Sequence, residues 1–148
     1  MGTAQEKDTE IYNITSTKTI TVPAAGAEIS YTVPAGKFWK LVAFKALLTT
    51  SSAVANRVPT LIFTDGTNEI YRNIGRTNIP ASQAVKLQAA QFPVLPADVA
   101  NSLEYYVIPY NFVLGPGYTI STSTAAIDTA DAYTAIFAIV YEYDTVTQ

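Results

Sequence analysis

Two acids in one polar loop, Asp128 and Asp131, are spaced in a way that could serve catalysis. Glycoside hydrolysis needs a pair of carboxyl groups about 5 to 9.5 Å apart, one acting as acid and the other as base or nucleophile. With Asp65, the same pair could offer oxygen ligands to Ca²⁺, although no EF-hand-like spacing supports such a site. The simpler interpretation, which we favour, is that Asp128 and Asp131 are solvated loop acids.

Most other catalytic chemistry is excluded by composition. The chain has no histidine and no cysteine, which removes the usual general base at neutral pH, the serine and cysteine triads, disulfides and most transition-metal sites. No phosphate-binding loop, dinucleotide-binding fingerprint or nucleophile-elbow motif is present. We therefore expect a protein that is not an enzyme, with no catalytic residue, no cofactor and no metal.

The ten tyrosines are the other residues with a possible functional meaning. Tyr105, Tyr106 and Tyr110 lie close together in the sequence and could form a platform on which sugar rings stack. Tyrosine is, however, a favoured strand residue and is equally common in protein interfaces. We favour this second interpretation, and we expect Tyr105 and Tyr106 on opposite faces of one strand.

The low charge of the chain indicates self-assembly. Charged residues make up 14% of the sequence, against about 25% in an ordinary globular protein, so part of the surface is expected to be covered by a partner. The net charge of −3 and the scattered basic residues argue against nucleic-acid binding. No apolar run is long enough to span a membrane, and the polar start predicts no signal peptide.

The segment from Tyr31 to Ser51 is the expected centre of the core and contains the only tryptophan, Trp39. Pro34 and Gly36 predict a tight turn that begins a long strand from 37 to 50. Lys40 and Lys45 are an odd number of residues apart, so a β-bulge between them would place both on one face. A helix is the alternative for this segment, but its β-branched and aromatic residues favour a strand.

The last strand, predicted from Tyr133 to Tyr143, carries no charge on either face up to Val140. Strict alternation would put Tyr133, Phe137, Ile139, Tyr141 and Tyr143 on one face and Ile136, Ala138 and Val140 on the other. We expect one face in the core and the other against a second sheet element or a neighbouring subunit.

Short strands separated by turn signals predict an all-β fold: a single-domain β-sandwich or jelly roll of about eight to ten antiparallel strands. The proposed domain covers residues 11–148, after an N-terminal arm at residues 1–10; residues 96–101 could form one helical turn. The remaining strands are expected at 11–22, 27–33, 58–64, 69–74, 84–92, 102–109 and 118–124.

Two turn-strand units resemble those of small virion proteins of tailed bacteriophages. The first is Val33-Pro34-Ala35-Gly36-Lys37-Phe38-Trp39-Lys40-Leu41, followed by Thr-Thr-Ser-Ser and Asn56-Arg57. The second is Leu114-Gly115-Pro116-Gly117-Tyr118, where Gly115 departs from the proline that is commoner in the family. The resemblance covers about residues 30 to 143, and its motifs are structural turns that carry no chemistry.

The resemblance implies a jelly-roll capsid cement or decoration protein on the capsid surface of the virion, made in the host cytoplasm. Such a protein would form homotrimers and bridge subunits of the major capsid protein, with no nucleic-acid or membrane partner. The alternative is a receptor- or carbohydrate-binding module of a tail or fibre. The candidate interface or core residues are Trp39, Phe44, Tyr133, Phe137, Ile139, Tyr141 and Tyr143, and the candidate arm residues are Ile11 and Tyr12.

Overall fold

The chain folds as an all-β sandwich, as the sequence predicts. The computed structural model describes residues 14–75, 78–91 and 103–145; the predicted arm at 1–10 and the predicted helical turn at 96–101 lie outside these ranges. The described residues contain no helix, and hence none that could cross a membrane. Their ten strands are β1 (Ser16–Thr19), β2 (Ser30–Thr32), β3 (Lys37–Thr49), β4 (Val58–Thr64), β5 (Glu69–Ile74), β6 (Ala84–Ala90), β7 (Leu103–Val107), β8 (Val113–Leu114), β9 (Thr119–Ala125) and β10 (Ala132–Asp144).

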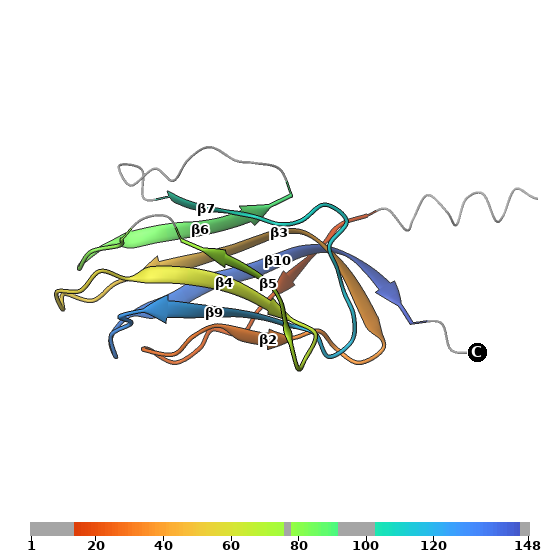
Figure 1. Ribbon diagram of the computed structural model, residues 1–148, viewed down its shortest axis with the longest axis horizontal. Helices are drawn as coiled ribbons and strands as arrows, with labels where there is room; N and C mark the ends of the chain where they lie inside the picture. Colours follow the sequence, from red (N-terminus) through yellow and green to blue (C-terminus); the bar gives the residue numbers. More distant parts are fainter. Residues whose placement is uncertain (1–13, 76–77, 92–102, 146–148) are drawn as a thin grey trace, which may run out of the picture.

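The strands form two sheets that run along the long axis of the molecule (Figure 1). Sheet A has the order β1-β10-β3-β6-β7, with β8 pairing with one end of β3, and sheet B has the order β2-β9-β4-β5. All pairs are antiparallel except β6 with β7, which are parallel. The predicted antiparallel sandwich is thus observed at every strand pair of the described residues except this one.

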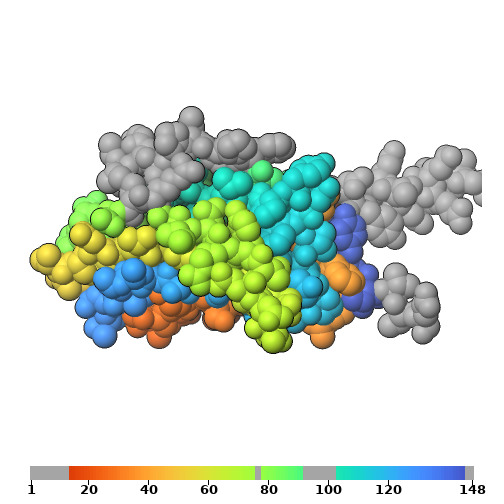
Figure 2. Space-filling model, viewed as in Figure 1, coloured from red at the N-terminus to blue at the C-terminus, as the bar shows by residue number. Residues whose placement is uncertain are grey.

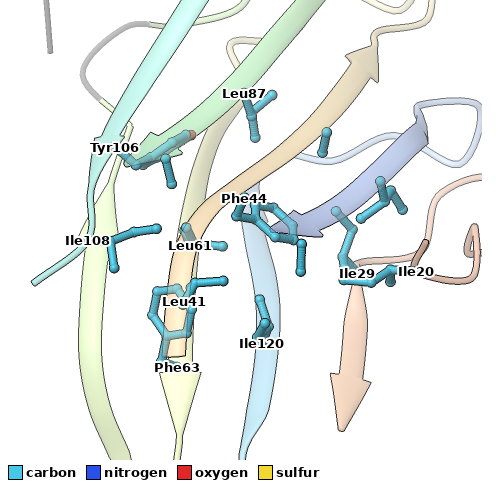
Figure 3. Packing of buried hydrophobic residues seen from close by; sticks show 14 of the residues in the cluster. Ile20, Ile29, Leu41, Phe44, Leu61, Phe63, Leu87, Tyr106, Ile108 and Ile120 are labelled. Atoms are coloured by element: carbon cyan, nitrogen blue, oxygen red, sulfur yellow. The ribbon is translucent and has the colours of Figure 1, made fainter. Parts of the chain in front are cut away.

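The core lies between the sheets and is built from roughly one side chain in two along the central strands (Figure 3). Leu41 and Phe44 of β3 face Leu61 and Phe63 of β4 and Ile120 of β9, and each is at most 1% exposed. Burying an aliphatic or aromatic side chain of this size stabilises the fold by about 1.5–3 kcal/mol relative to leaving it in water. This alternation is what the two-residue period of the sequence predicts.

Strand β3 contains the predicted bulge. Leu41 pairs with Val140 and Ala43 with Ile139, which leaves Val42 as one extra residue on β3. The inward series therefore changes from Trp39 and Leu41 to Phe44, Ala46 and Leu48. Lys40 and Lys45 both end on the outer face, as expected, and the alternative of a helix over this segment is wrong.

Strand β10 contains a second bulge that strict alternation does not predict. Thr134 pairs with Leu47 and Phe137 with Lys45, so β10 holds one residue more than β3 between these pairs. Ala135 occupies the bulge with φ of 49°, a left-handed conformation that is unfavourable for a residue with a Cβ atom. The predicted faces of β10 are therefore wrong at Tyr133, which shares the core side with Ile136, Ala138 and Val140.

One open side of the sandwich is closed by contacts between the edge strands β5 and β7. The Tyr71 hydroxyl and the Asn73 amide both donate hydrogen bonds to the carbonyl oxygen of Val107, at 2.9 and 3.1 Å. On the surface, β5 lies beside the segment that follows β7 (lime and cyan in Figure 2). Both donors bind a backbone carbonyl oxygen at the edge of β7. They therefore join the two sheets without a continuous ladder of backbone hydrogen bonds.

The two turns that carry the phage resemblance form one structural unit. Val33 N donates to Tyr118 O at 2.8 Å, and Gly117 N donates to Val33 O at 3.0 Å. Gly36 and Gly117 have φ values of 77° and 82°, which glycine adopts without the steric cost of a side chain. Both turns lie at the end of the sandwich where β3 begins. The geometry of these turns is sufficient to explain why both sequences contain Pro and Gly.

Candidate functional site

The acidic loop before β10 is tied to the start of β4 by a buried ion pair. Arg57 and Asp131 have fully buried side chains, with Nε to Oδ2 at 2.9 Å and Nη2 to Oδ1 at 3.1 Å. The remaining guanidinium hydrogens are donated to the carbonyl oxygens of Ala53 and Ala55 and to the Ser51 hydroxyl. This bidentate pair joins two loops at one end of the sandwich (left in Figure 1), so its role is structural.

The expectation that both loop acids are solvated is wrong for Asp131. Its carboxylate also accepts hydrogen bonds from the backbone N–H groups of Ser51 and Asp128, both at 2.8 Å. Asp128 is partly exposed and accepts from the Ser51 hydroxyl at 2.8 Å and from Ala130 N at 3.0 Å. With its oxygens already bound to donors, Asp131 has little capacity left to act as a nucleophile or a general base.

Asp65, the third acid of the possible calcium site, lies at the opposite end of β4. It closes the β4–β5 hairpin by accepting from the backbone N–H groups of Thr67 and Asn68, at 2.9 and 2.7 Å. Among residues 14–75, 78–91 and 103–145, no group of three or more acids is placed to hold a metal ion. The fold therefore places Asp65 far from Asp128 and Asp131, so the three acids do not form the calcium site that the sequence left possible.

The pKa of Asp131 provides a test of this ion pair. Burial alone would raise this pKa, but the hydrogen bonds from Arg57, Asp128 and Ser51, with the guanidinium charge, hold it below the ordinary value of 3.8. A lowered pKa in the folded state means that the unfolded chain binds protons first, so the stabilisation is present above pH 3.8 and is lost as the pH falls through the folded pKa. We expect a ¹³C NMR titration of the Asp131 carboxyl carbon to give a midpoint below 3.8, and a midpoint at or above 3.8 would contradict the ion pair.

The three neighbouring tyrosines do not form a stacking platform. Tyr106 is buried and donates from its hydroxyl to the carbonyl oxygen of Pro59 at 3.1 Å, and burial raises its pKa. Tyr105 lies on the opposite, outer side of β7, as predicted, and Tyr110 is 73% exposed in the segment that follows. The predicted alternative of a sugar-stacking platform made by these three tyrosines therefore gains no support from their arrangement.

The outer face of sheet A is the surface with the composition of an interface. Its outward side chains include Phe137, Ile139 and Tyr141 of β10, Leu47 of β3, and Tyr105 and Val107 of β7. These are half-buried only by their neighbours in the sheet, with no second layer of described chain above them. A sheet face that carries this many outward apolar side chains is a candidate site of association.

Three lysines are distributed over the same face: Lys40 and Lys45 on β3 and Lys86 on β6. Within the parts of the chain that the structure describes, none of the three makes a salt bridge and no outward residue of sheet A is acidic. The face is therefore apolar and positively charged, although the chain as a whole has a net charge of −3.

A hollow in this face lies above the β10 bulge. Its volume is 230 Å³, and it is bounded by Lys45, Lys86 and Phe137, with Leu47 and Ala135 among its lining residues. The small side chain of Ala135 leaves the space unfilled where a regular strand would place a larger residue. Cavities of about 150 Å³ can hold a benzene ring, so the hollow has room for one aromatic or branched side chain.

The outer face of sheet B differs in kind. Its outward positions on β4 and β9 include the hydroxyl residues Thr64, Ser121 and Ser123, and the face also carries Ile62 and the exposed Ile74. Hydroxyl side chains keep favourable contacts with water and give little free energy on burial. The outer face of sheet A is different in that it combines apolar side chains, three lysines and a hollow.

Comparison with known proteins gives this chain no family. No family model matches its sequence, and no curated protein matches it.

The candidate interface or core residues fall into two groups in the structure. Trp39, Phe44 and Tyr133 are core residues with at most 1% exposure. The other four, on the outer face of sheet A, are Phe137, Ile139, Tyr141 and Tyr143. Ile11 and Tyr12 lie outside the described residues.

Sequence reasoning missed Arg57 and the hollow. Arg57 was visible only as part of an Asn-Arg pair before a strand, and its partner lies 74 residues away. The hollow depends on the bulge at Ala135, and alanine is no signal for a positive φ. The lysines of the outer face were visible in the sequence, but their common face depended on the bulge in β3.

Proposed function

We propose that this chain is a structural, non-enzymatic protein that self-associates through the outer face of sheet A. The observation that carries the proposal is the combination of Phe137, Ile139 and Tyr141 on one sheet face, over which no described strand lies, with a hollow beside them. These side chains are already half-buried in their own sheet, so covering the rest of each in a subunit interface contributes less than the value of about 1.5–3 kcal/mol for a fully exposed side chain. The low content of charged residues, 14%, also supports a protein that is covered by partners in its working state.

On the resemblance of the two turn units, we further propose that the assembly is a homotrimer that acts as a capsid cement or decoration protein of a tailed phage. In this role the trimer bridges subunits of the major capsid protein and stabilises the shell by interface burial, with several contacts per trimer adding avidity. No chemical step is involved. The contribution of the protein is the free energy of binding to the assembled shell.

Sedimentation of the purified chain tests the proposal. We expect a mass of three times the 15.9 kDa chain, and co-sedimentation with empty shells of the parent phage. Changing Phe137 and Ile139 together to Thr, which keeps strand preference, should weaken association by more than about tenfold, since 1.4 kcal/mol corresponds to a factor of ten.

The matched control is Ile62→Thr with Ile74→Thr, two outward apolar residues of sheet B. This variant should assemble like the unmodified chain, and circular dichroism should show that both variants remain folded. A chain that is monomeric at all accessible concentrations and ignores the shells would contradict the proposal, as would equal weakening by the two variants.

A further inference from the structure

The hollow on sheet A requires an occupant with an apolar side chain and nearby carboxylates. Lys45 pairs with Gln88, and Lys86 pairs with Leu47, so the two lysines are diagonal neighbours about 7–8 Å apart at the edge of the hollow. Two copies of this face placed directly against each other would bring lysine against lysine, which is electrostatically unfavourable. The partner surface must therefore be different from the face itself, and acidic.

The acids in the described residues are already engaged within their own chain. Glu69 pairs with Arg72, Asp144 with Lys37, Glu142 with Lys18, and Asp131 with Arg57. The other four are held by hydrogen bonds or further interactions: Glu28 by Thr122 and Thr124, Asp65 and Asp128 by their own turns, and Glu104 in the buried part of β7. Of the twelve acids in the sequence, this leaves Asp98 and the three acids near the N-terminus.

The three N-terminal acids are regularly spaced in the sequence. Glu6, Asp8 and Glu10 alternate with other residues and are followed by Tyr12 at the same interval. In an extended segment, residues two apart point to the same side. Such a segment would present three carboxylates and one aromatic ring together, spread over about 20 Å at about 3.3 Å per residue. In charge and in kind these groups are complementary to a face with three lysines and a hollow with room for one ring.

The direction of β1 indicates that the segment comes from another copy. Ser16 pairs with Val140 and Thr19 with Phe137, so the chain that precedes Ser16 is directed toward the Tyr143 end of β10. The hollow beside Ala135 and Phe137 lies in the opposite direction along the same strand. Ile14 and Thr15 therefore lead away from the hollow of their own chain, which favours a contact with a neighbour, and exchange of this kind around a ring is a closed heterologous contact.

We propose that residues 6–12 of one copy bind the outer face of sheet A of a neighbouring copy, with Tyr12 in the hollow and the carboxylates of Glu6, Asp8 and Glu10 against Lys40, Lys45 and Lys86. This inference rests on the proposed self-association and specifies what fills the interface. It assigns the N-terminal segment a binding role and gives the three lysines a function.

The absence of cysteine from the chain makes the contact testable by disulfide trapping. We would mix two full-length chains, one with Asn13→Cys and the other with Gln88→Cys, which lines the hollow, label one with ¹⁵N, and oxidise the mixture. Mass spectrometry should find the 13–88 disulfide at least tenfold more often than the 13–62 disulfide formed in a control mixture with Ile62→Cys on sheet B. Equal yields would overturn the proposal.

Charge reversal tests the electrostatic part. Replacing Glu6, Asp8 and Glu10 by Lys in the chain that carries Asn13→Cys should reduce the 13–88 yield at least fivefold, and adding Lys45→Glu and Lys86→Glu to its partner should restore it. A yield that is unchanged by reversal would overturn the proposed contact. In a single chain with both cysteines, a disulfide formed only within that chain would also overturn it, because the segment would then cover its own face.

The mass of the same single-cysteine chains separates this inference from the proposed function. A trimer that binds shells but shows no preference for the 13–88 disulfide would contradict the inference and leave the proposed function standing. A strict monomer would contradict the self-association on which both depend.

Discussion

Replacing Arg57 by Met should lower the free energy of unfolding by about 3–5 kcal/mol, because it leaves the buried carboxylate of Asp131 without its counter-charge. Both side chains of this pair are 0% exposed, and the carbonyl oxygens of Ala53 and Ala55 also lose their donor. A single domain is stable by only about 5–15 kcal/mol, so the loss would be a large part of the total. Urea denaturation followed by far-UV circular dichroism measures it.

The matched control for Arg57→Met is Arg72→Met. Arg72 forms an equally well-aligned pair with Glu69, but the pair is exposed on β5, where the solvent screens the interaction and little stability is expected from it. The double variant Arg57→Met with Asp131→Leu should lose less than the sum of the two single changes, because no charge is then left buried. A loss below about 1 kcal/mol for Arg57→Met would contradict the structural role of the pair.

Local patterns in the sequence were sufficient to predict every described strand except the short β8, and most of the core. The Pro34–Gly36 turn begins β3, and the Asp65-Gly66 pair closes the β4–β5 hairpin as expected. The bulge in β3 could also be predicted, because two lysines on a buried strand must reach the same solvent-exposed side. In each case the information is contained within a few neighbouring residues.

Features that depend on contacts between distant segments could not be predicted in the same way. Asp131 looked like a solvated loop acid until the fold placed Arg57 beside it. The faces of β10 were assigned by strict alternation, which the bulge at Ala135 breaks after Tyr133. The parallel pairing of β6 with β7 likewise depends on the path of the chain between them.

Part of the candidate interface could be predicted from the sequence. A last strand that is apolar on both sides predicts a second buried face, and the structure places Phe137 and Ile139 on a side that no described element covers. The strand order β10-β3-β6 determines which neighbouring strands complete that face. The charged residues that these strands contribute to it are lysines only. The hydroxyl-rich face of sheet B made the choice between the two outer faces possible.

Replacing Trp39 by Ala should cost about 3–5 kcal/mol of unfolding free energy, since truncation of a buried Trp removes transfer free energy and leaves a cavity. Trp39 is 1% exposed and stacks on Tyr31 with ring centroids 5.2 Å apart and an angle of 14° between planes. Its indole Nε1 donates to Glu142 Oε2 at 2.8 Å, and Glu142 also pairs with Lys18. The ring thus fills the end of the core, and its hydrogen bond to Glu142 joins β3 to β10.

Trp39→Phe separates these two contributions. It keeps most of the apolar contact and the stacked ring but removes the indole donor, and Glu142 retains Lys18 and access to water, so we expect about 1–2 kcal/mol of loss. Because Trp39 is the only tryptophan, unfolding of both variants must be followed by circular dichroism instead of indole fluorescence. If Trp39→Phe were as damaging as Trp39→Ala, the hydrogen bond to Glu142, and not the burial of the ring, would be the main contribution of this residue.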